Sequence, residues 1–93
     1  MWNMYDVEQV RHVTGHVVFL RFEDGLAGEL DLSKYIGFGP VFKPLANVEF
    51  FAKVFLEGGT IAWPNGADIA PERLYEELEA LNKAAHPGAA AAR

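Results

Sequence analysis

Residues 16–32 read HVVFLRFEDGLAGELDL, and this stretch carries the clearest structural signal in the chain. Apolar residues alternate on both sides of Asp24-Gly25, a pair that tolerates the positive φ of a tight hairpin turn. Side chains two residues apart share one face of a strand. The apolar face therefore comprises Val18, Leu20, Phe22, Leu26, Leu30 and Leu32. Because Glu29 and Asp31 lie on the opposite face, we predict an antiparallel hairpin with one buried and one solvated face.

Strand signals continue on both sides of this hairpin. Residues 5–13, YDVEQVRHV, are rich in strand-forming residues and end at a Thr14-Gly15 turn, which predicts a leading strand. Residues 54–56 and 60–63 flank Glu57-Gly58-Gly59 and predict a second hairpin. Together these segments predict an antiparallel sheet of about five strands, built from two hairpins and a leading strand.

An amphipathic helix follows the predicted strands. Pro71 suits a first helical position, and residues 71–84, PERLYEELEALNKA, place Leu74, Leu78 and Leu81 on one stripe. We expect this stripe to pack on the apolar face of the first hairpin. The predicted fold class is α+β, an antiparallel sheet covered by a C-terminal helix at 71–84.

The middle of the chain is irregular. Residues 33–36 predict one helical turn, which glycines and a proline end at 37–40. Residues 41–45, VFKPL, are expected to be extended, because a residue before proline avoids the helical region. Asn47 can cap a short helix near 47–52.

Length and composition allow one domain. The chain has 93 residues, 51% of them hydrophobic and 23% charged, which is typical of a globular protein. We expect a single domain at 1–85 and a flexible tail at 86–93, HPGAAAAR. No segment approaches the roughly 20 apolar residues of a membrane helix, and the start does not resemble a signal peptide. With no cysteines as well, a cytoplasmic location without membrane contact is expected.

The charge balance limits the partners. Thirteen acidic residues against eight basic ones give a formal net charge of −5, and the basic residues are scattered. Nucleic-acid binding relies on clustered basic residues, so the charge pattern argues against a nucleic-acid partner. The acidity indicates either solubility or a basic partner.

The stretch TIAWPNGADIAPERLYE, residues 60–76, admits two interpretations. In the first, it is a strand–turn–helix junction: Pro64 ends the strand, an Asn-Gly pair turns the chain, and Asp68 caps the helix. In the second, Trp63, Asn65 and Asp68 form the rim of a site for a small ligand or a partner, because loops on rigid elements often carry binding residues. The sequence leaves both open.

Catalytic and metal signals are weak. Ser33 is the single serine and has no glycine elbow around it, so no nucleophile is indicated. His12 and His16 flank a turn without an evident third ligand, so no metal is expected. We therefore predict no catalytic residues, no metal and no cofactor, and a protein that is not an enzyme.

Five phenylalanines lie within residues 38–55, FGPVFKPLANVEFFAKVF, together with Lys43 and Lys53. Aromatic and basic residues mixed in this way can form a stacking surface for single-stranded nucleic acid. Most of these rings are expected in the core, which a small domain needs. One or two left over could form an apolar patch for a second subunit.

Three blocks of the sequence resemble the bacterial domain of unknown function 2442 family. They are DGLAGELDLSKYIG at 24–37, FGPVFKPLANVEFFAKV at 38–54 and TIAWPNGADIAPERLYE at 60–76. The resemblance spans roughly Val7 to Leu78, and the WPNGAD stretch is its most specific part. One departure is Ala70, where relatives often carry Asp or Ser before the helix proline, which leaves Asp68 or the backbone to cap the helix.

The resemblance implies a small α+β bacterial protein without an established activity. Relatives are sometimes joined to a helix-turn-helix domain or encoded beside another small protein in an arrangement that looks like a toxin–antitoxin pair. We therefore expect a non-enzymatic interaction or regulatory module, an antitoxin-like partner of a small protein encoded nearby, with a homodimer as a further option. The alternative is a small-ligand-binding domain with its site at Trp63, Asn65 and Asp68.

Overall fold

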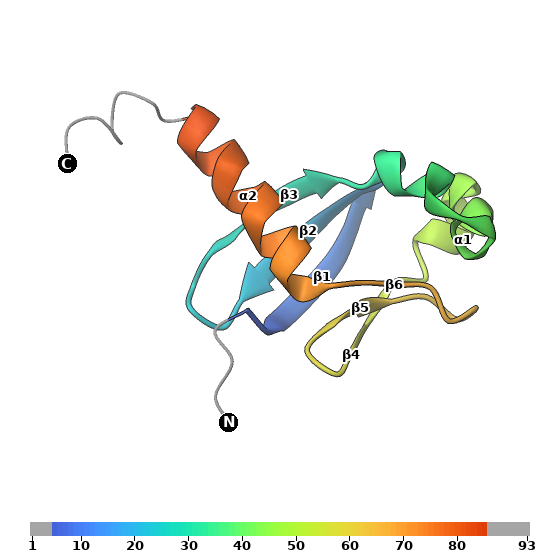
Figure 1. Cartoon of the computed structure of the whole chain (residues 1–93), viewed down its shortest axis with the longest axis horizontal. Helices are drawn as coiled ribbons and strands as arrows, with labels where there is room; N and C mark the ends of the chain where they lie inside the picture. Colours follow the sequence, from blue (N-terminus) through green and yellow to red (C-terminus); the bar gives the residue numbers. More distant parts are fainter. Residues whose placement is uncertain (1–4, 86–93) are drawn as a thin grey trace.

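The computed structural model describes residues 5–85, and the predicted flexible tail at 86–93 lies outside them (Figure 1). In chain order the elements are β1 (Val7–Thr14), β2 (Val17–Phe22), β3 (Ala27–Asp31), the 3-10 helices η1 (Ser33–Phe38) and η2 (Pro40–Ala46), α1 (Val48–Phe51), β4 (Phe55–Glu57), β5 (Thr60–Ala62), β6 (Asp68–Ile69) and α2 (Pro71–Ala85). The α+β class is confirmed, and so is the C-terminal helix, which is one residue longer than predicted.

The strands form two antiparallel sheets of three strands each, ordered β1-β2-β3 and β4-β5-β6. The prediction of one sheet of about five strands is therefore wrong. Both predicted hairpins form, but the second one pairs with β6, a two-residue strand that follows the WPNGA turn. The sheets meet where the Val7 N–H donates to the Gly59 carbonyl at 2.8 Å, at the start of β1.

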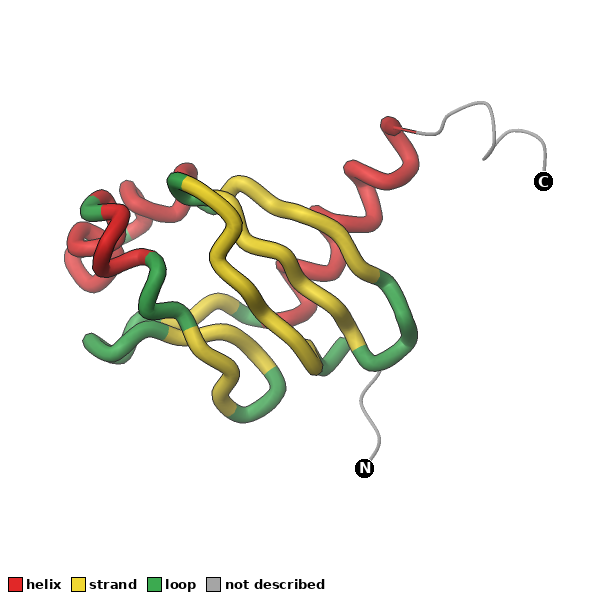
Figure 2. The backbone as a smooth tube through the Cα atoms, turned by 180° about the vertical axis from the view of Figure 1, so that it is seen from behind, coloured by secondary structure: helices red, strands yellow, loops and turns green. Residues whose placement is uncertain are grey.

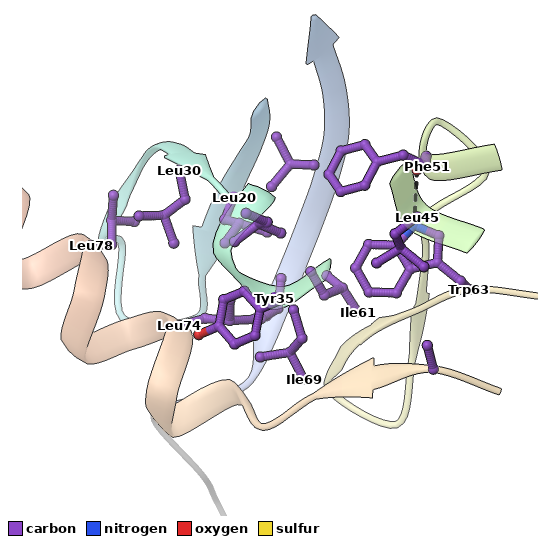
Figure 3. Packing of buried hydrophobic residues seen from close by; sticks show 14 of the residues in the cluster. Leu20, Leu30, Tyr35, Leu45, Phe51, Ile61, Trp63, Ile69, Leu74 and Leu78 are labelled. Carbon is purple, nitrogen blue, oxygen red and sulfur yellow. Dashed lines mark hydrogen bonds between the residues drawn. The ribbon is translucent and has the colours of Figure 1, made fainter. Parts of the chain in front are cut away.

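The first sheet buries one face as predicted. Val18 pairs with Leu30 and Leu20 with Gly28, so the alternating apolar residues share the face that α2 covers (Figures 1 and 3). Gly28 permits the close approach of α2, because a Cβ added there would lie 2.8 Å from Leu78 Cδ1. Figure 2 shows the sheet from behind, with its outer face open in front of α2.

The helical stripe packs only in part. Leu74 and Leu78 are buried, whereas Leu81 is 50% exposed, so the prediction that Leu81 reaches the sheet is wrong. The physical reason is geometric: α2 crosses the narrow first sheet obliquely, and its last turns extend past β3 (Figure 1). Leu81, in the last turns of this helix, is therefore only half covered.

The middle segment is more helical than predicted. The turn at 33–36 forms and extends into η1, but residues 41–45 belong to η2, so the expectation of extended chain is wrong. Both prolines of η2 have a φ fixed near −65°, which suits a 3-10 helix as well as an extended chain. The short helix is confirmed as α1, and Asn47 caps it by accepting from the Phe50 N–H at 3.1 Å.

One hydrophobic cluster takes residues from every element except β4. It runs from the α2 contact of the first sheet, through Tyr35, Ile61 and Ile69, to Leu45, Phe51 and Trp63 at the other end (Figure 3). The two sheets and the 3-10 segment thus share one core, and the WPNGAD stretch is built into it.

Candidate functional site

Trp63 belongs to the core. Its side chain is 1% exposed, and its indole N–H donates to the Phe51 carbonyl at 2.9 Å (Figure 3). The Trp63 and Phe51 rings lie 5.6 Å apart between centroids. The indole therefore holds α1 against the second sheet, and no part of it is open to a ligand.

Asn65 fastens the turn that follows. Its side-chain amide donates to the Val41 carbonyl at 2.8 Å, and its side-chain oxygen accepts from the Ala67 N–H at 3.2 Å. The Trp63 N–H donates to the Ala67 carbonyl at 2.9 Å, which closes the turn. Gly66 occupies the turn with a φ of 93°, a conformation that favours glycine. Asn65 thus joins the turn to η2.

Asp68 does not cap α2, contrary to the junction interpretation. It lies in β6, paired with Ala62, and its side chain is exposed. The first turn of α2 instead forms on the Ala70 carbonyl, which accepts from the N–H groups of Arg73 and Leu74. The backbone of Ala70 takes the cap position where relatives were expected to carry Asp or Ser. The structure does not bring Trp63, Asn65 and Asp68 to one surface.

Asp68 instead lies beside a small hollow between η1, β6 and α2. The hollow has a volume of about 140 Å³, and its lining comprises Tyr35, Phe38, Phe42, Asp68, Ile69, Ala70 and Arg73. Phe38 is 55% exposed and stands beside the Tyr35 ring at 4.8 Å between centroids. The Arg73 guanidinium lies 5.9 Å from the centre of the Phe38 ring, within the range of a cation–π contact.

We call Phe38, Phe42 and Arg73 the Phe38 patch. Phe38 is exposed, and Phe42 is half-buried with its ring 6.4 Å from that of Phe38. Within residues 5–85 the ion pairs are Arg21–Glu8 and Lys34–Glu77, so Arg73 has no carboxylate partner there. The patch therefore combines exposed aromatic surface with a guanidinium that interacts with the Tyr35 hydroxyl and forms no ion pair among the described residues.

Tyr35 forms the floor of the hollow and is fixed in place. Its hydroxyl donates to Glu77, which also pairs with Lys34 at 3.1 Å. Burial, with the hydrogen bond to Glu77 adding to it, raises the pKa of Tyr35 well above its ordinary value. The phenol therefore stays protonated and keeps donating, which makes the floor a rigid support for Phe38.

The two histidines hold structure together. The His12 ring N–H donates to the Gly15 carbonyl at 2.9 Å, and that of His16 donates to the Leu45 carbonyl at 2.7 Å. Both rings also pack edge-on against Phe51. Among the described residues, no group of three or more side chains could hold a metal ion.

The aromatic segment mostly packs inward. Phe51 is buried in the core, and Phe42 and Phe50 are partly buried against it, so the expectation that most of these rings are core holds only in part. Phe38 and Phe55 are exposed, but they come from η1 and β4 rather than from one stacking row. No helix among residues 5–85 is long and apolar enough to cross a membrane.

Sequence reasoning missed Phe38 and Arg73 as a pair. A signal existed for Phe38, because a large apolar residue between two glycines, Gly37 and Gly39, has little local chain to cover it. Nothing in the spacing of the sequence connects it to Arg73, which is 35 residues away and meets it only through the packing of η1 on α2.

Comparison with known proteins gives one match. A family model described as "Protein of unknown function (DUF2442)" matches residues 7–80, and it therefore includes the Phe38 patch and the WPNGAD stretch. No curated protein and no solved structure matches the chain significantly. Because the family model covers most of its length, the chain belongs to the DUF2442 family of proteins of unknown function.

Proposed function

We propose that this protein is a non-enzymatic interaction module that binds a small protein encoded beside it through the Phe38 patch. The observation that carries the proposal is the exposure of Phe38, the most exposed large hydrophobic side chain of the described residues. It stands beside a hollow and under a guanidinium with no carboxylate partner. Arginine and aromatic residues beside a small pocket are typical of binding hot spots.

The exposed area is sufficient for a hot spot. An aromatic side chain offers roughly 150–250 Å² of surface, so about 100 Å² of Phe38 stays open at 55% exposure. Covering that area contributes about 2.5 kcal/mol at roughly 25 cal/mol per Å². A contribution of about 2 kcal/mol or more marks a hot-spot residue at a protein interface.

The size of the hollow favours a protein partner over a small ligand. Small-molecule sites occupy roughly 300–1,000 Å³, whereas this hollow has about 140 Å³. That volume suits a single apolar side chain inserted by a partner. The alternative, a small-ligand site at Trp63, Asn65 and Asp68, has less support because the indole of Trp63 is buried.

The charges indicate what the partner brings. Arg73 forms no ion pair within residues 5–85, but Asp68 lines the same hollow and would repel a second carboxylate there. A carboxylate of the partner would therefore reach Arg73 from the side of Phe38, next to the inserted apolar side chain. Closing the patch against a partner would exclude water and strengthen that ion pair. The docking segment of the partner is therefore apolar with an acidic neighbour.

The test uses purified protein and the product of the adjacent gene, with affinity measured by calorimetry. Phe38→Ala should weaken the complex by at least about tenfold, or 1.4 kcal/mol. Phe55→Ala is the matched control, because Phe55 is 39% exposed on β4, outside the patch, and its replacement should change the affinity less than about twofold. Arg73→Ala should weaken binding more than Arg73→Lys, which keeps the charge.

Three outcomes would contradict the proposal: no complex with the neighbouring protein, a complex that Phe38→Ala leaves unchanged, or a homodimer that Phe38→Ala dissociates. The last would assign the patch to a second copy of this chain.

An antitoxin-like role predicts a further result in a growth assay. Expression of the neighbouring protein alone should slow growth, wild-type chain should restore growth, and the Phe38→Ala variant should restore it less.

A further inference from the structure

The outer edge of β3 has backbone groups that pair with no other strand among residues 5–85. β3 lies at the edge of the first sheet. The Phe22 N–H donates to the Leu26 carbonyl, and the Leu32 N–H donates to the His16 carbonyl, which fixes the phase of the β2–β3 ladder. In an antiparallel ladder, successive residues alternately direct their backbone N–H and C=O groups toward the paired strand and away from it. The backbone N–H and C=O groups of Ala27, Glu29 and Asp31 therefore point away from β2, toward the open edge.

An apolar groove runs beside this edge. It has a volume of about 400 Å³ and lies between β3 and α2, and its lining comprises Leu30, Asp31, Lys34, Glu77, Ala80 and Leu81. Leu81, which is half-exposed, forms its wall and continues the stripe of Leu74 and Leu78. Both views of the backbone show the C-terminal part of α2 extending beyond β3 (Figures 1 and 2). The helix thus overhangs the place that a fourth strand would occupy.

The charges at this edge select the occupant. Glu29 and Asp31 are exposed on the outer face of β3, and neither is in an ion pair among the described residues. A second copy paired antiparallel through its own β3 would bring four carboxylates to one seam, where like charges repel. A strand with basic residues on that face would instead neutralise them, in keeping with the net charge of −5.

We propose that β3 binds an extended basic–apolar segment of another protein, which adds a fourth strand to the first sheet. Its backbone pairs with Ala27, Glu29 and Asp31, and its alternate side chains divide between the two faces. The apolar ones enter the groove against Leu81, and the basic ones lie beside the two carboxylates. This inference rests on the proposed function as an interaction module, but it uses a surface separate from the Phe38 patch.

The probe is the fluorescent heptapeptide KVRVKIR, and EVEVEIE is its acidic counterpart. Binding to the full chain is followed by anisotropy, and amide hydrogen exchange is followed by NMR. The basic peptide should bind at least about tenfold more tightly than the acidic one. It should also protect the amides of Ala27, Glu29 and Asp31, whereas ordinary charge attraction without strand pairing would leave them exchanging.

Variants separate the parts of this site. Leu81→Ser should weaken peptide binding by at least about tenfold, whereas Leu56→Ser, on a leucine 40% exposed on β4, should change binding less than about twofold. Ala27→Pro removes an N–H on the outer edge and leaves both carboxylates and the bonds to β2, so it should weaken binding while the fold is kept. Phe38→Ala should leave peptide binding unchanged, which distinguishes failure of this site from failure of the Phe38 patch.

The inference is overturned by any of four results. They are absence of peptide binding at millimolar concentration, equal binding of the acidic peptide, binding without protection of the β3 amides, and protection of these amides by dimerisation without any peptide.

Discussion

Replacing Trp63 by Phe tests the structural role of the WPNGAD stretch. The change removes the indole N–H that donates to the Phe51 carbonyl. The carbonyl of Phe51 is not left unpaired, because it still accepts from the Val54 N–H at 3.2 Å. Loss of the indole hydrogen bond therefore costs about 1 kcal/mol. The smaller ring leaves a void at position 63, where the native side chain is 1% exposed, and this void costs about 1–2 kcal/mol more. The expected loss in the free energy of unfolding is thus about 2–3 kcal/mol.

Urea unfolding followed by circular dichroism measures this loss, and Phe38→Ala serves as the surface control. In a domain of this size, a loss of about 2–3 kcal/mol lowers Tm by roughly 10–20 °C. In a background with Trp2→Phe, the fluorescence of Trp63 should resist quenching by acrylamide. A loss below about 0.5 kcal/mol, as surface positions give, together with easy quenching would refute the reasoning.

Three further changes test neighbouring parts of the structure. Asn65→Asp keeps the acceptor within the turn but loses the donor to η2, so urea unfolding should show a loss of about 1 kcal/mol. The hydrogen bond that the Tyr75 hydroxyl donates to Asp24 lowers the pKa of Asp24 and raises the pKa of Tyr75 to about 12. Because the folded chain holds the phenolic proton more tightly than the unfolded chain, whose pKa is 10.0, this stabilisation is complete below pH 10 and lost toward pH 12. Tyr75→Phe should reduce that alkaline loss in thermal unfolding, and an unchanged profile would contradict it. Gly59→Ala should cost at least about 1–2 kcal/mol, because Gly59 has a φ of 84° and its Cβ would lie 2.7 Å from a carboxylate oxygen. Gly37→Ala, where nothing lies within 4 Å, should be nearly neutral in the same denaturation assay.

Local patterns were enough to predict the elements of the first sheet and the last helix. The alternation in residues 16–32 fixes which side chains face inward, and the spacing of Leu74 and Leu78 fixes the face of α2. Both are properties of neighbouring residues, so no knowledge of tertiary pairing is needed.

Pairing between distant segments could not be predicted in this way. β6 has two residues and exists because the turn around Asn65 returns the chain to β5, where the Thr60 hydroxyl also donates to the Ile69 carbonyl. No periodicity exists in so short a strand. The choice between one sheet and two depends on such pairings, which explains why the predicted single sheet was wrong.

The candidate site was the least predictable part. Trp63 and Asn65 are residues that sites use, but here their polar groups bond to the backbone of α1 and η2. A buried indole needs such a partner, so the same residue suits a core and a binding rim equally well at the level of sequence. Of the three predicted residues, Asp68 alone lines the hollow. Its neighbours in that lining include Phe38 of η1 and Arg73 of α2.

The most direct test of the Phe38 patch is photocrosslinking in cells that express the neighbouring protein. A photoreactive phenylalanine analogue is placed at position 38 and, in a control, at position 55, which is exposed on the second sheet. The proposal predicts a crosslink to the neighbouring protein from position 38 and none from position 55. Crosslinking from position 55 alone, or from neither position, would contradict it.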